Sequence, residues 1–389
     1  MSRSRAAFLA LSVLASLFAA GRADAIPAFA RKYQISCSTC HAPFPRLKPF
    51  GEEFAAAGFR MPDPAKEPAR ATVETGDPLL QLPRDFPLAA RLEGHAAWKE
   101  DAAAEADFEW PYAFKLLMGG PLGKKISYYV YYILEQGESG KLEDAWVQFN
   151  GLFGAPLDLQ VGQFQVCDPM FKRELRLERF DYEILKTRVG FSPTNLTYDR
   201  GLLLAWHAPA KIDVVATVVN GNGIEEADEE GNFDEESFKN TSLRLVRPFG
   251  PVRVGLFGYY GTNASDEGIR NSLWYAGPDI VWDIAKEWQF SAQYLERQDS
   301  NPYFAEASPE FETRGGFAEL HFFPAGQDGR WALSALYNTV DSDDEAAIYE
   351  SASITMNYLI ARNVRLLVEA GRDLEADANT ASIGLVTAW

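Results

Sequence analysis

The sequence predicts a mostly β protein, a 16-stranded antiparallel transmembrane β-barrel plugged by a small α-helical N-terminal domain. From Pro87 onward, segments of about ten residues alternate apolar and polar side chains and are separated by turn residues, which is typical of outer-membrane barrels. The connections alternate between short turns rich in Gly and Pro and longer acidic loops. The last segment ends the chain on Trp389 and has an apolar face, similar to the assembly signal of such barrels.

The first 25 residues have the features of a secretory signal peptide. Two arginines come first, an apolar run follows at 8–20, and Ala23-Asp24-Ala25 has the small-x-small form of a cleavage site. We therefore expect residues 1–25 to be removed and the mature chain to start near Ile26, outside the cytoplasm. No later segment offers eighteen consecutive apolar residues, so we expect no transmembrane helix in the mature chain.

A short motif close to this cleavage site predicts electron transfer. Cys37-Ser38-Thr39-Cys40-His41 has the form of a c-type haem attachment site, in which two thiols form thioethers and the histidine ligates the iron. The predicted cofactor is thus one covalent haem c, bound by Cys37, Cys40 and His41. Met61 is the only methionine near the motif and is the predicted sixth iron ligand, although it could equally be a core side chain.

The predicted haem domain covers residues 26–75, and the barrel covers residues 76–389. About fifty residues are near the lower limit for an independent core, so the haem and the barrel wall must supply much of the burial. Leu47, Phe50 and Phe54 recur at helical spacing and Gly58 is a plausible helix stop. We expect this helix to cover the haem and the domain to plug the barrel.

The barrel is predicted to have an even number of strands, as a chain that enters and leaves on the same side of a membrane requires. Their predicted starts are Leu88, Phe108, Lys125, Leu142, Leu157, Arg200, Lys211, Asn240, Val252, Asn271, Lys286, Glu312, Arg330, Ala347, Arg362 and Asn379. If the first strand runs outward, the short turns all fall on the periplasmic side and the long loops on the outside.

Three wall residues and two loops are candidate functional features. Alternation places His95, Glu319 and His321 on the lumen face, where each could ligate haem or a cation, or remain a solvated polar group. Loop Val166–Asp199 mixes charged and apolar residues and is expected to fold inward as a constriction.

The acidic loop Gly221–Lys239 either concentrates cations at the outer mouth or is a solvated, disordered segment. The third cysteine, Cys167, is either a packing residue or a redox group.

The distribution of charge narrows the range of partners. Residues 26–75 contain seven Lys and Arg against five Asp and Glu, whereas the rest of the mature chain contains 27 against 49. Phosphate groups would be repelled, so nucleic acid is not an expected partner. Cations and basic proteins are favoured instead.

The N-terminal residues carry a resemblance to a known family. The run Pro27-Ala28-Phe29-Ala30-Arg31-Lys32-Tyr33, the haem motif, Phe44-Pro45, Phe50-Gly51 and Gly58 resemble the start of fused outer-membrane cytochrome-porins, the iron-oxidising monohaem cytochromes. The barrel is similar to phosphate-selective porins, notably at Val161-Gly162-Gln163-Phe164.

The resemblance implies an iron:cytochrome c oxidoreductase in the outer membrane of a Gram-negative bacterium. Its implied partners are extracellular Fe(II), a periplasmic cytochrome c and outer-membrane lipid, and its haem domain lies in the periplasm or inside the barrel. Two alternatives stay open from the residues. The conduit could carry electrons outward to an extracellular acceptor, or the barrel could be a solute porin whose haem plug responds to redox state.

Overall fold

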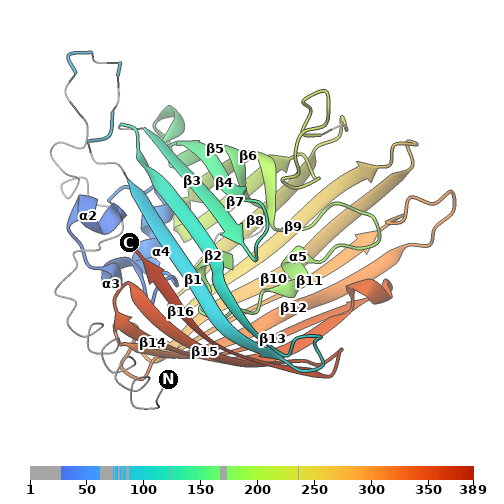
Figure 1. The fold of residues 1–389 in the computed structure, drawn as a ribbon. Helices are drawn as coiled ribbons and strands as arrows, with labels where there is room; N and C mark the ends of the chain where they lie inside the picture. The colour runs from blue at the N-terminus through green and yellow to red at the C-terminus, as the bar shows by residue number, and fades with distance from the viewer. Residues whose placement is uncertain are drawn as a thin grey trace.

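The described residues form a closed antiparallel barrel, in which every strand pairs with its neighbours in sequence and the first pairs with the last (Figure 1). The computed structural model describes residues 28–61, 73, 75–77, 79, 80, 82–84, 87–123, 125–166, 173–234 and 236–389. The predicted signal peptide and Cys167 lie outside these residues. The predicted fold class, a barrel of sixteen strands with small N-terminal helices, is confirmed.

Each predicted strand start lies within two residues of an observed one. The strands are β1 (Leu88–Lys99), β2 (Ala106–Pro121), β3 (Ile126–Glu135), β4 (Lys141–Phe149), β5 (Leu157–Gln165), β6 (Tyr198–Ala208), β7 (Ile212–Val219), β8 (Asn240–Phe249), β9 (Val252–Ala264), β10 (Arg270–Ala285), β11 (Trp288–Asp299), β12 (Phe311–Phe322), β13 (Trp331–Ser342), β14 (Tyr349–Ala361), β15 (Val364–Asp373) and β16 (Ala378–Ala388).

Within the part of the chain that the structure describes, the helices are few and short. The α-helices are α2 (Ala28–Tyr33), α3 (Cys37–Cys40), α4 (Pro49–Ala56) and α5 (Glu183–Lys186), and the single 3-10 turns are η2 (Leu152–Gly154), η4 (Arg173–Leu175), η5 (Pro209–Lys211) and η6 (Glu345–Ala347). Within the described residues, no helix is long and apolar enough to cross a membrane.

The barrel closes where β1 meets β16. Ala90 and Trp389 exchange two backbone hydrogen bonds of 2.8 and 2.9 Å at the end of this seam. Further along it His95 lies opposite Gly384, and a β-carbon at Gly384 would overlap the His95 ring. Gly384 therefore makes room for His95 on the lumen face, and closure leaves no unpaired sheet edge.

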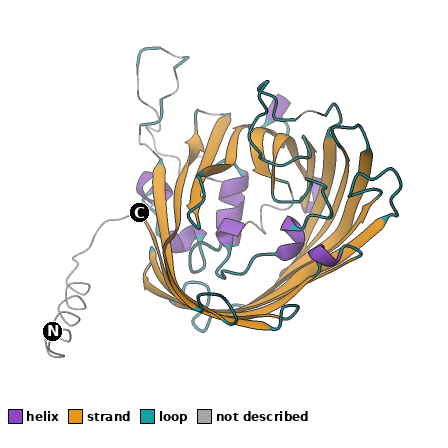
Figure 2. Ribbon diagram, turned by 45° about the vertical axis from the view of Figure 1, so that its right-hand side comes forward, coloured by secondary structure: helices purple, strands orange, loops and turns teal. Residues whose placement is uncertain are grey.

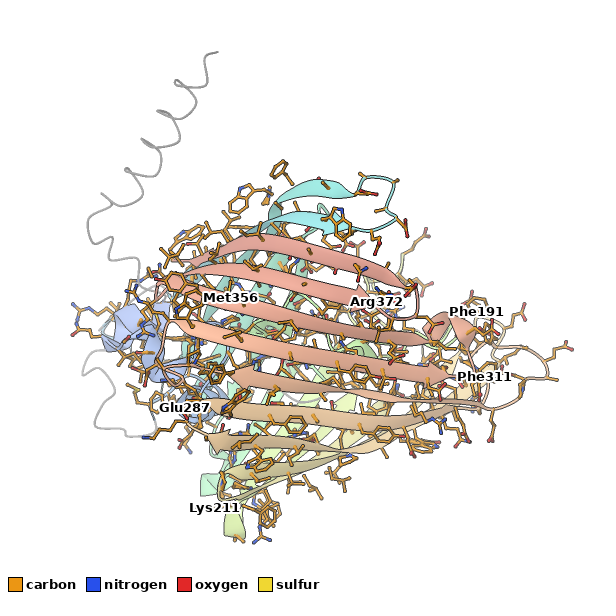
Figure 3. All side chains as sticks on the ribbon, turned by 90° about the horizontal axis from the view of Figure 1, so that it is seen from below. Phe191, Lys211, Glu287, Phe311, Met356 and Arg372 are labelled. Carbon is orange, nitrogen blue, oxygen red and sulfur yellow. The ribbon has the colours of Figure 1, made fainter. Side chains whose placement is uncertain are left out.

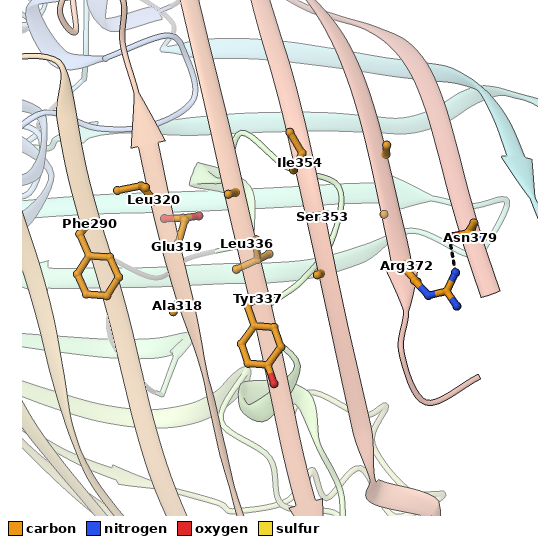
Figure 4. Close-up of a pocket in the computed structure, with 14 residues that line it drawn as sticks. Phe290, Ala318, Glu319, Leu320, Leu336, Tyr337, Ser353, Ile354, Arg372 and Asn379 are labelled. Atoms are coloured by element: carbon orange, nitrogen blue, oxygen red, sulfur yellow. Dashed lines mark hydrogen bonds between the residues drawn. The ribbon is translucent and has the colours of Figure 1, made fainter. Parts of the chain in front are cut away.

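The wall is polar inside and apolar outside. On β12 the inward Glu319 is buried, whereas the adjacent Ala318 and Leu320 are only partly covered because they point outward (Figure 4). Figure 3 shows outward side chains along the whole wall, from Met356 near the N-terminal helices to Phe311 near the long loops. A shallow groove of about 540 Å³ also lies in this wall, across β11 to β16 (Figure 4). A wall with polar side chains inside and apolar side chains outside is the arrangement that a lipid environment requires.

The short connections lie at one end of the barrel and the long connections at the other, as predicted. One end, here the short-turn end, carries turns such as 250–251 and 362–363, whereas the opposite long-loop end carries 166–197 and 220–239. The N-terminal helices lie at the short-turn end (Figures 1 and 2). We refer to residues 28–61, which contain these helices, as the plug.

Aromatic side chains seat the plug against the wall. Phe54 and Phe59 are buried, and the Phe59 ring stacks on Trp146 at 6.0 Å and lies 5.2 Å from Tyr129. The chain leaves α4 at Gly58, which has the positive φ of 68° expected at a helix stop. Leu47 differs from the prediction, since it lies before the helix and forms a β-bridge with His41.

Polar contacts join the plug to several strands. Glu52 pairs with Arg253 at 2.6 Å, Arg31 donates to the carbonyl of Leu88 at 2.7 Å, and Gln148 donates to the carbonyl of Ala56 at 3.0 Å. These contacts reach β9, β1 and β4, so strands in different parts of the barrel circumference hold the plug.

The loop between β5 and β6 folds into the lumen. The sequence predicted this inward fold for a loop that constricts the barrel. Leu177, Ile184 and Leu185 are buried, and α5 packs against β12 and β13. Arg297 of β11 anchors the loop by donating to the carbonyls of Thr187 and Thr194 at 3.3 and 3.1 Å. Figure 2 shows this segment inside the barrel outline.

The stacking of Phe59 predicts how strongly the plug is held. Phe59→Ala removes a buried ring and should destabilise the plug by about 3 to 5 kcal/mol, the usual cost of this change in a core. Limited proteolysis of the detergent-solubilised protein should then release the N-terminal segment faster. Phe153→Ala is the control, because that ring is 96% exposed at the same end. Equal cleavage rates for the two variants would contradict a plug seated by Phe59.

Candidate functional site

The two cysteines of the haem motif lie on one helical turn. Ser36 caps α3, its Oγ accepting from the Ser38 amide at 3.3 Å, so Cys37 and Cys40 occupy the i and i+3 positions of one face. Both sulfurs are partly buried and neither is in a disulfide. This is the side-chain arrangement that two thioether bonds to one haem need.

His41 is held in an orientation that suits iron ligation. Its amide donates to the carbonyl of Cys37 at 2.9 Å, and Nδ1 lies 3.0 Å from the carbonyl of Pro45. A proton on Nδ1 donates this bond and leaves Nε2 as the nitrogen for a metal. Burial lowers the pKa of His41, which favours the neutral imidazole that metals bind.

Helix α4 packs closely on the motif. The amide of Lys48 donates to the carbonyl of Cys40 at 2.8 Å, and a β-carbon at Gly51 would overlap that same carbonyl. Gly51 is therefore required by a close approach of two backbones, which explains the Phe-Gly pair noted in the sequence.

The surroundings of the cysteines favour uncharged sulfur. Burial raises the pKa of Cys37, and burial together with the neighbouring Cys37 raises the pKa of Cys40 to about 11. Such a site disfavours a thiolate but suits the neutral sulfur of a thioether. The donor set and its burial thus fit a covalent c-type haem.

The residues after His41 insert between the wall and the inward loop. Ala42 packs in one cluster with Leu177 of the loop, Phe323 directly after β12 and Ala332 of β13. Phe44 packs with Leu359 and Val386 of β14 and β16. The segment that follows the haem motif is therefore held between the barrel wall and the inward loop.

Arg46 connects the motif to the lumen wall. Its guanidinium donates to Gln289 at 2.8 Å, to Ser291 at 3.2 Å and to Glu319 at 3.0 Å. These partners come from β11 and β12, more than 240 residues away in the chain. Charged hydrogen bonds in a buried setting are strong, and losing one partner leaves a costly unpaired charge.

The structure places the other predicted residues as follows. His95, Glu319 and His321 are all buried and face inward, as predicted. The ring of His95 lies edge-on to Tyr112 at 5.0 Å. Met61 packs beside the aromatic cluster of the plug, and its role as sixth ligand stays a prediction.

The described part of the acidic loop is hydrogen-bonded. Asp228 accepts from the amides of Glu230 and Asn232 at 2.8 and 2.7 Å. Glu236 accepts from the amide of Ala264 at 2.7 Å. These hydrogen bonds define the conformation of the described carboxylates at the long-loop end, and the attraction of cations by this loop stays a prediction.

Two residues that the sequence did not single out as ligands are prominent in the structure. Arg46 lies five residues after the motif and pairs with Glu319, whereas Glu178 lies in the inward loop and approaches His321. Alternation along β12 predicted which wall residues face the lumen. It carried no signal for which loop and plug residues meet them there.

The comparisons with known proteins support the barrel fold. No protein-family model matches the chain, and no curated protein matches it. Solved structures do match, including OmpT of Vibrio cholerae in its trimer form, with 11% identity, 78% of this chain and 98% of that chain covered, and a TM-score of 0.55.

An anion-selective porin from Comamonas acidovorans has 10% identity, the same coverage of 78% and 98%, and a TM-score of 0.56. OmpF of Salmonella typhi in complex with daunomycin has 10% identity, coverage of 78% and 98%, and a TM-score of 0.53. At this level of identity the similarity shows a porin-type barrel fold.

The motif geometry predicts covalent attachment. The native protein should keep a haem that survives denaturing electrophoresis and stains for peroxidase activity, whereas Cys37→Ala/Cys40→Ala should lose the stain because no thioether can form. Ser38→Ala, between the cysteines, is the control. Absence of bound haem in the native protein would contradict the site.

The sixth ligand has its own test. If Met61 ligates the iron, Met61→Leu should abolish the methionine-to-iron charge-transfer band of the ferric protein and lower its reduction potential, because a thioether ligand raises it. Met356→Leu, on the outer wall, should leave both unchanged. A band that persists in Met61→Leu would assign the position to another side chain.

Proposed function

We propose that the protein is an outer-membrane electron conduit that oxidises extracellular Fe(II) and passes the electron to a periplasmic carrier. The observation that carries this proposal is that the Cys37–His41 motif is joined to a porin-type barrel by a segment that packs against the wall and the inward loop. In the bound state, the haem would accept one electron on one side and donate it on the other. A redox motif anchored to one end of a membrane-spanning barrel is of use mainly for moving electrons across the membrane.

The protein's own residues hold the haem and separate the two sides. Cys37 and Cys40 supply the thioether sulfurs and His41 the proximal nitrogen. Ala42 and Phe44 fix this segment against the wall and the inward loop. The plug places the motif toward the short-turn end, where a periplasmic cytochrome c would dock.

Placement in the outer membrane of a Gram-negative bacterium is part of the proposal. It is supported by the apolar outward wall, by the pairing of Trp389 at the closing seam and by the porin-type fold. The sidedness follows from loop length, because bacterial barrels have short periplasmic turns and long external loops.

The charge of the long loops supports a cationic substrate. The segment Gly221–Lys239 contains eight Asp and Glu, and its described part forms an exposed, ordered surface at the long-loop end. Such a surface raises the local concentration of cations such as Fe(II). Oxidised iron hydrolyses and precipitates near neutral pH, so keeping the product outside the cell is a physical reason for this architecture.

Solute transport is the second candidate function. It is favoured by the fold, since the similar structures include an anion-selective porin. The plug and the inward loop occupy the lumen, so transport through this barrel would require the plug to respond to the redox state of the haem. Solute flux into liposomes that changes with haem oxidation would support this alternative.

Stopped-flow spectroscopy tests the proposal. Anaerobic addition of Fe(II) to the oxidised protein in detergent should reduce the haem with one Fe(II) consumed per haem, followed by its absorbance bands. The variant Cys37→Ala/Cys40→Ala, which cannot attach haem, is the control for absorbance changes that come from iron in solution. No haem reduction by Fe(II) would reject iron oxidation, and a midpoint potential far below that of Fe(III)/Fe(II) would favour outward electron flow.

The same assay tests the acidic surface. Replacing Glu225, Glu226, Glu229 and Glu230 by Gln should slow the bimolecular phase at low ionic strength and flatten its salt dependence, because the attraction is screened within about 10 Å at 0.1 M salt. An unchanged rate would remove the loop from the proposal without affecting the haem site.

A further inference from the structure

Three buried side chains with metal-binding atoms meet in the lumen. Glu178 comes from the inward loop, and Glu319 and His321 come from β12. One ligand atom can be taken from each so that all three lie within 4.8 Å of one another. Nε2 of His321 lies 2.7 Å from Glu319, and Nδ1 lies 3.7 Å from Glu178.

The cluster has a carboxylate oxygen that its protein contacts do not satisfy. Oε1 of Glu178 is fully buried and makes no hydrogen bond, whereas the equally buried Nε2 of His321 contacts Glu319 at 2.7 Å. Buried polar atoms are normally paired, because leaving one without a partner costs about 1 to 3 kcal/mol. An unpartnered carboxylate oxygen 3.7 Å from the His321 ring, with a second carboxylate on the same ring, indicates that a cation belongs in the cluster.

The charges of the cluster favour a cation. The guanidinium of Arg46 is 3.0 Å from Glu319, and that of Arg365 lies beside Glu178, where it donates to the carbonyl of Leu177 at 2.8 Å. With a neutral His321, the two carboxylates and Arg46 carry a formal charge of −1. The Tyr182 hydroxyl donates to the second oxygen of Glu319 at 2.9 Å and adds no charge at neutral pH.

Neighbouring groups orient the ligands. Nδ1 of His321 lies 2.8 Å from Ser334 Oγ, and the second oxygen of Glu178 accepts from the Leu177 amide at 3.0 Å. Supporting hydrogen bonds of this kind hold metal ligands in place in metalloproteins. Ligand distances to an ion are about 2.1 Å, so entry of the ion would part His321 and Glu319 slightly.

We propose that Glu178, Glu319 and His321 form a binding site for a divalent transition-metal cation inside the barrel. Two carboxylates and one imidazole suit Fe(II), Mn(II) or Zn(II), whereas Ca(II) and Mg(II) prefer oxygen ligands alone. Three protein ligands also leave coordination positions open for water.

The site lies next to the haem motif. Ala42, adjacent to His41, packs against Leu177 and Phe323, which lie within two residues of Glu178 and His321 respectively. Arg46 joins the same loop of the plug to Glu319. The cation is therefore assigned as the Fe(II) substrate. That assignment rests on the proposed function, whereas the binding site itself does not.

Binding of Mn(II) to the full-length protein tests the site independently of electron transfer. With the haem reduced beforehand and in about 0.5 M salt, which screens the external acidic loops, the loss of the free Mn(II) EPR signal counts bound ions. The native protein should bind one Mn(II) per chain, and anaerobic Fe(II) should displace it. Glu178→Gln and His321→Gln should weaken binding by about 10- to 100-fold.

The control is His207→Gln, which should bind as the native protein does. His207 also lies between two carboxylates, those of Asp158 and Asp213, but at the exposed short-turn end. Glu178 is on the loop and not in the wall, so Glu178→Gln tests the site even where a wall substitution impairs barrel assembly. Absence of Mn(II) binding by the native protein, or native affinity in Glu178→Gln, would overturn the site.

The same variants separate the site from the proposed function. Mn(II) binding without haem reduction by Fe(II) would support the site and reject iron oxidation. Haem reduction at the native rate in a Glu178→Gln variant that no longer binds Mn(II) would overturn the assignment of Fe(II) as its ligand, while iron oxidation would stand.

Discussion

Closure of the strand ladder is the constraint on which the rest of this structure depends. Lipid offers no hydrogen-bond partners, so every strand has to satisfy its backbone in its neighbours, including β1 with β16. Closure forces alternate side chains inward. That alternation assembles polar residues such as Glu319 and His321 in a space shielded from both lipid and bulk water.

The plug uses that space in place of a core of its own. Its described residues bury Phe54 and Phe59 against Trp146 and fix Ala42 and Phe44 between the wall and the inward loop. A segment this small is marginal alone. The wall and the inward loop therefore supply burial that so short a segment lacks, and they set at which end of the barrel the motif lies.

Buried charge is the other consequence of an enclosed lumen. Arg46, Glu178, Glu319 and His321 come from three separate segments and meet out of water, where an unpaired charge is expensive and a paired one holds its partners firmly. The same contacts that anchor the plug thus bring metal-binding atoms beside the haem motif. Anchoring and cation binding would then be linked through Glu319.

The sequence by itself determined the strands, their starts within two residues, the sidedness of the connections and the inward face of β12, because period-two alternation and turn chemistry are local properties. The haem motif is local too, since Cys37, Cys40 and His41 share one turn. Only the tertiary structure decided that Arg46 meets Glu319, 273 residues later, and that Glu178 meets His321. Those contacts depend on how the plug and the inward loop pack inside a closed wall, which no local pattern records.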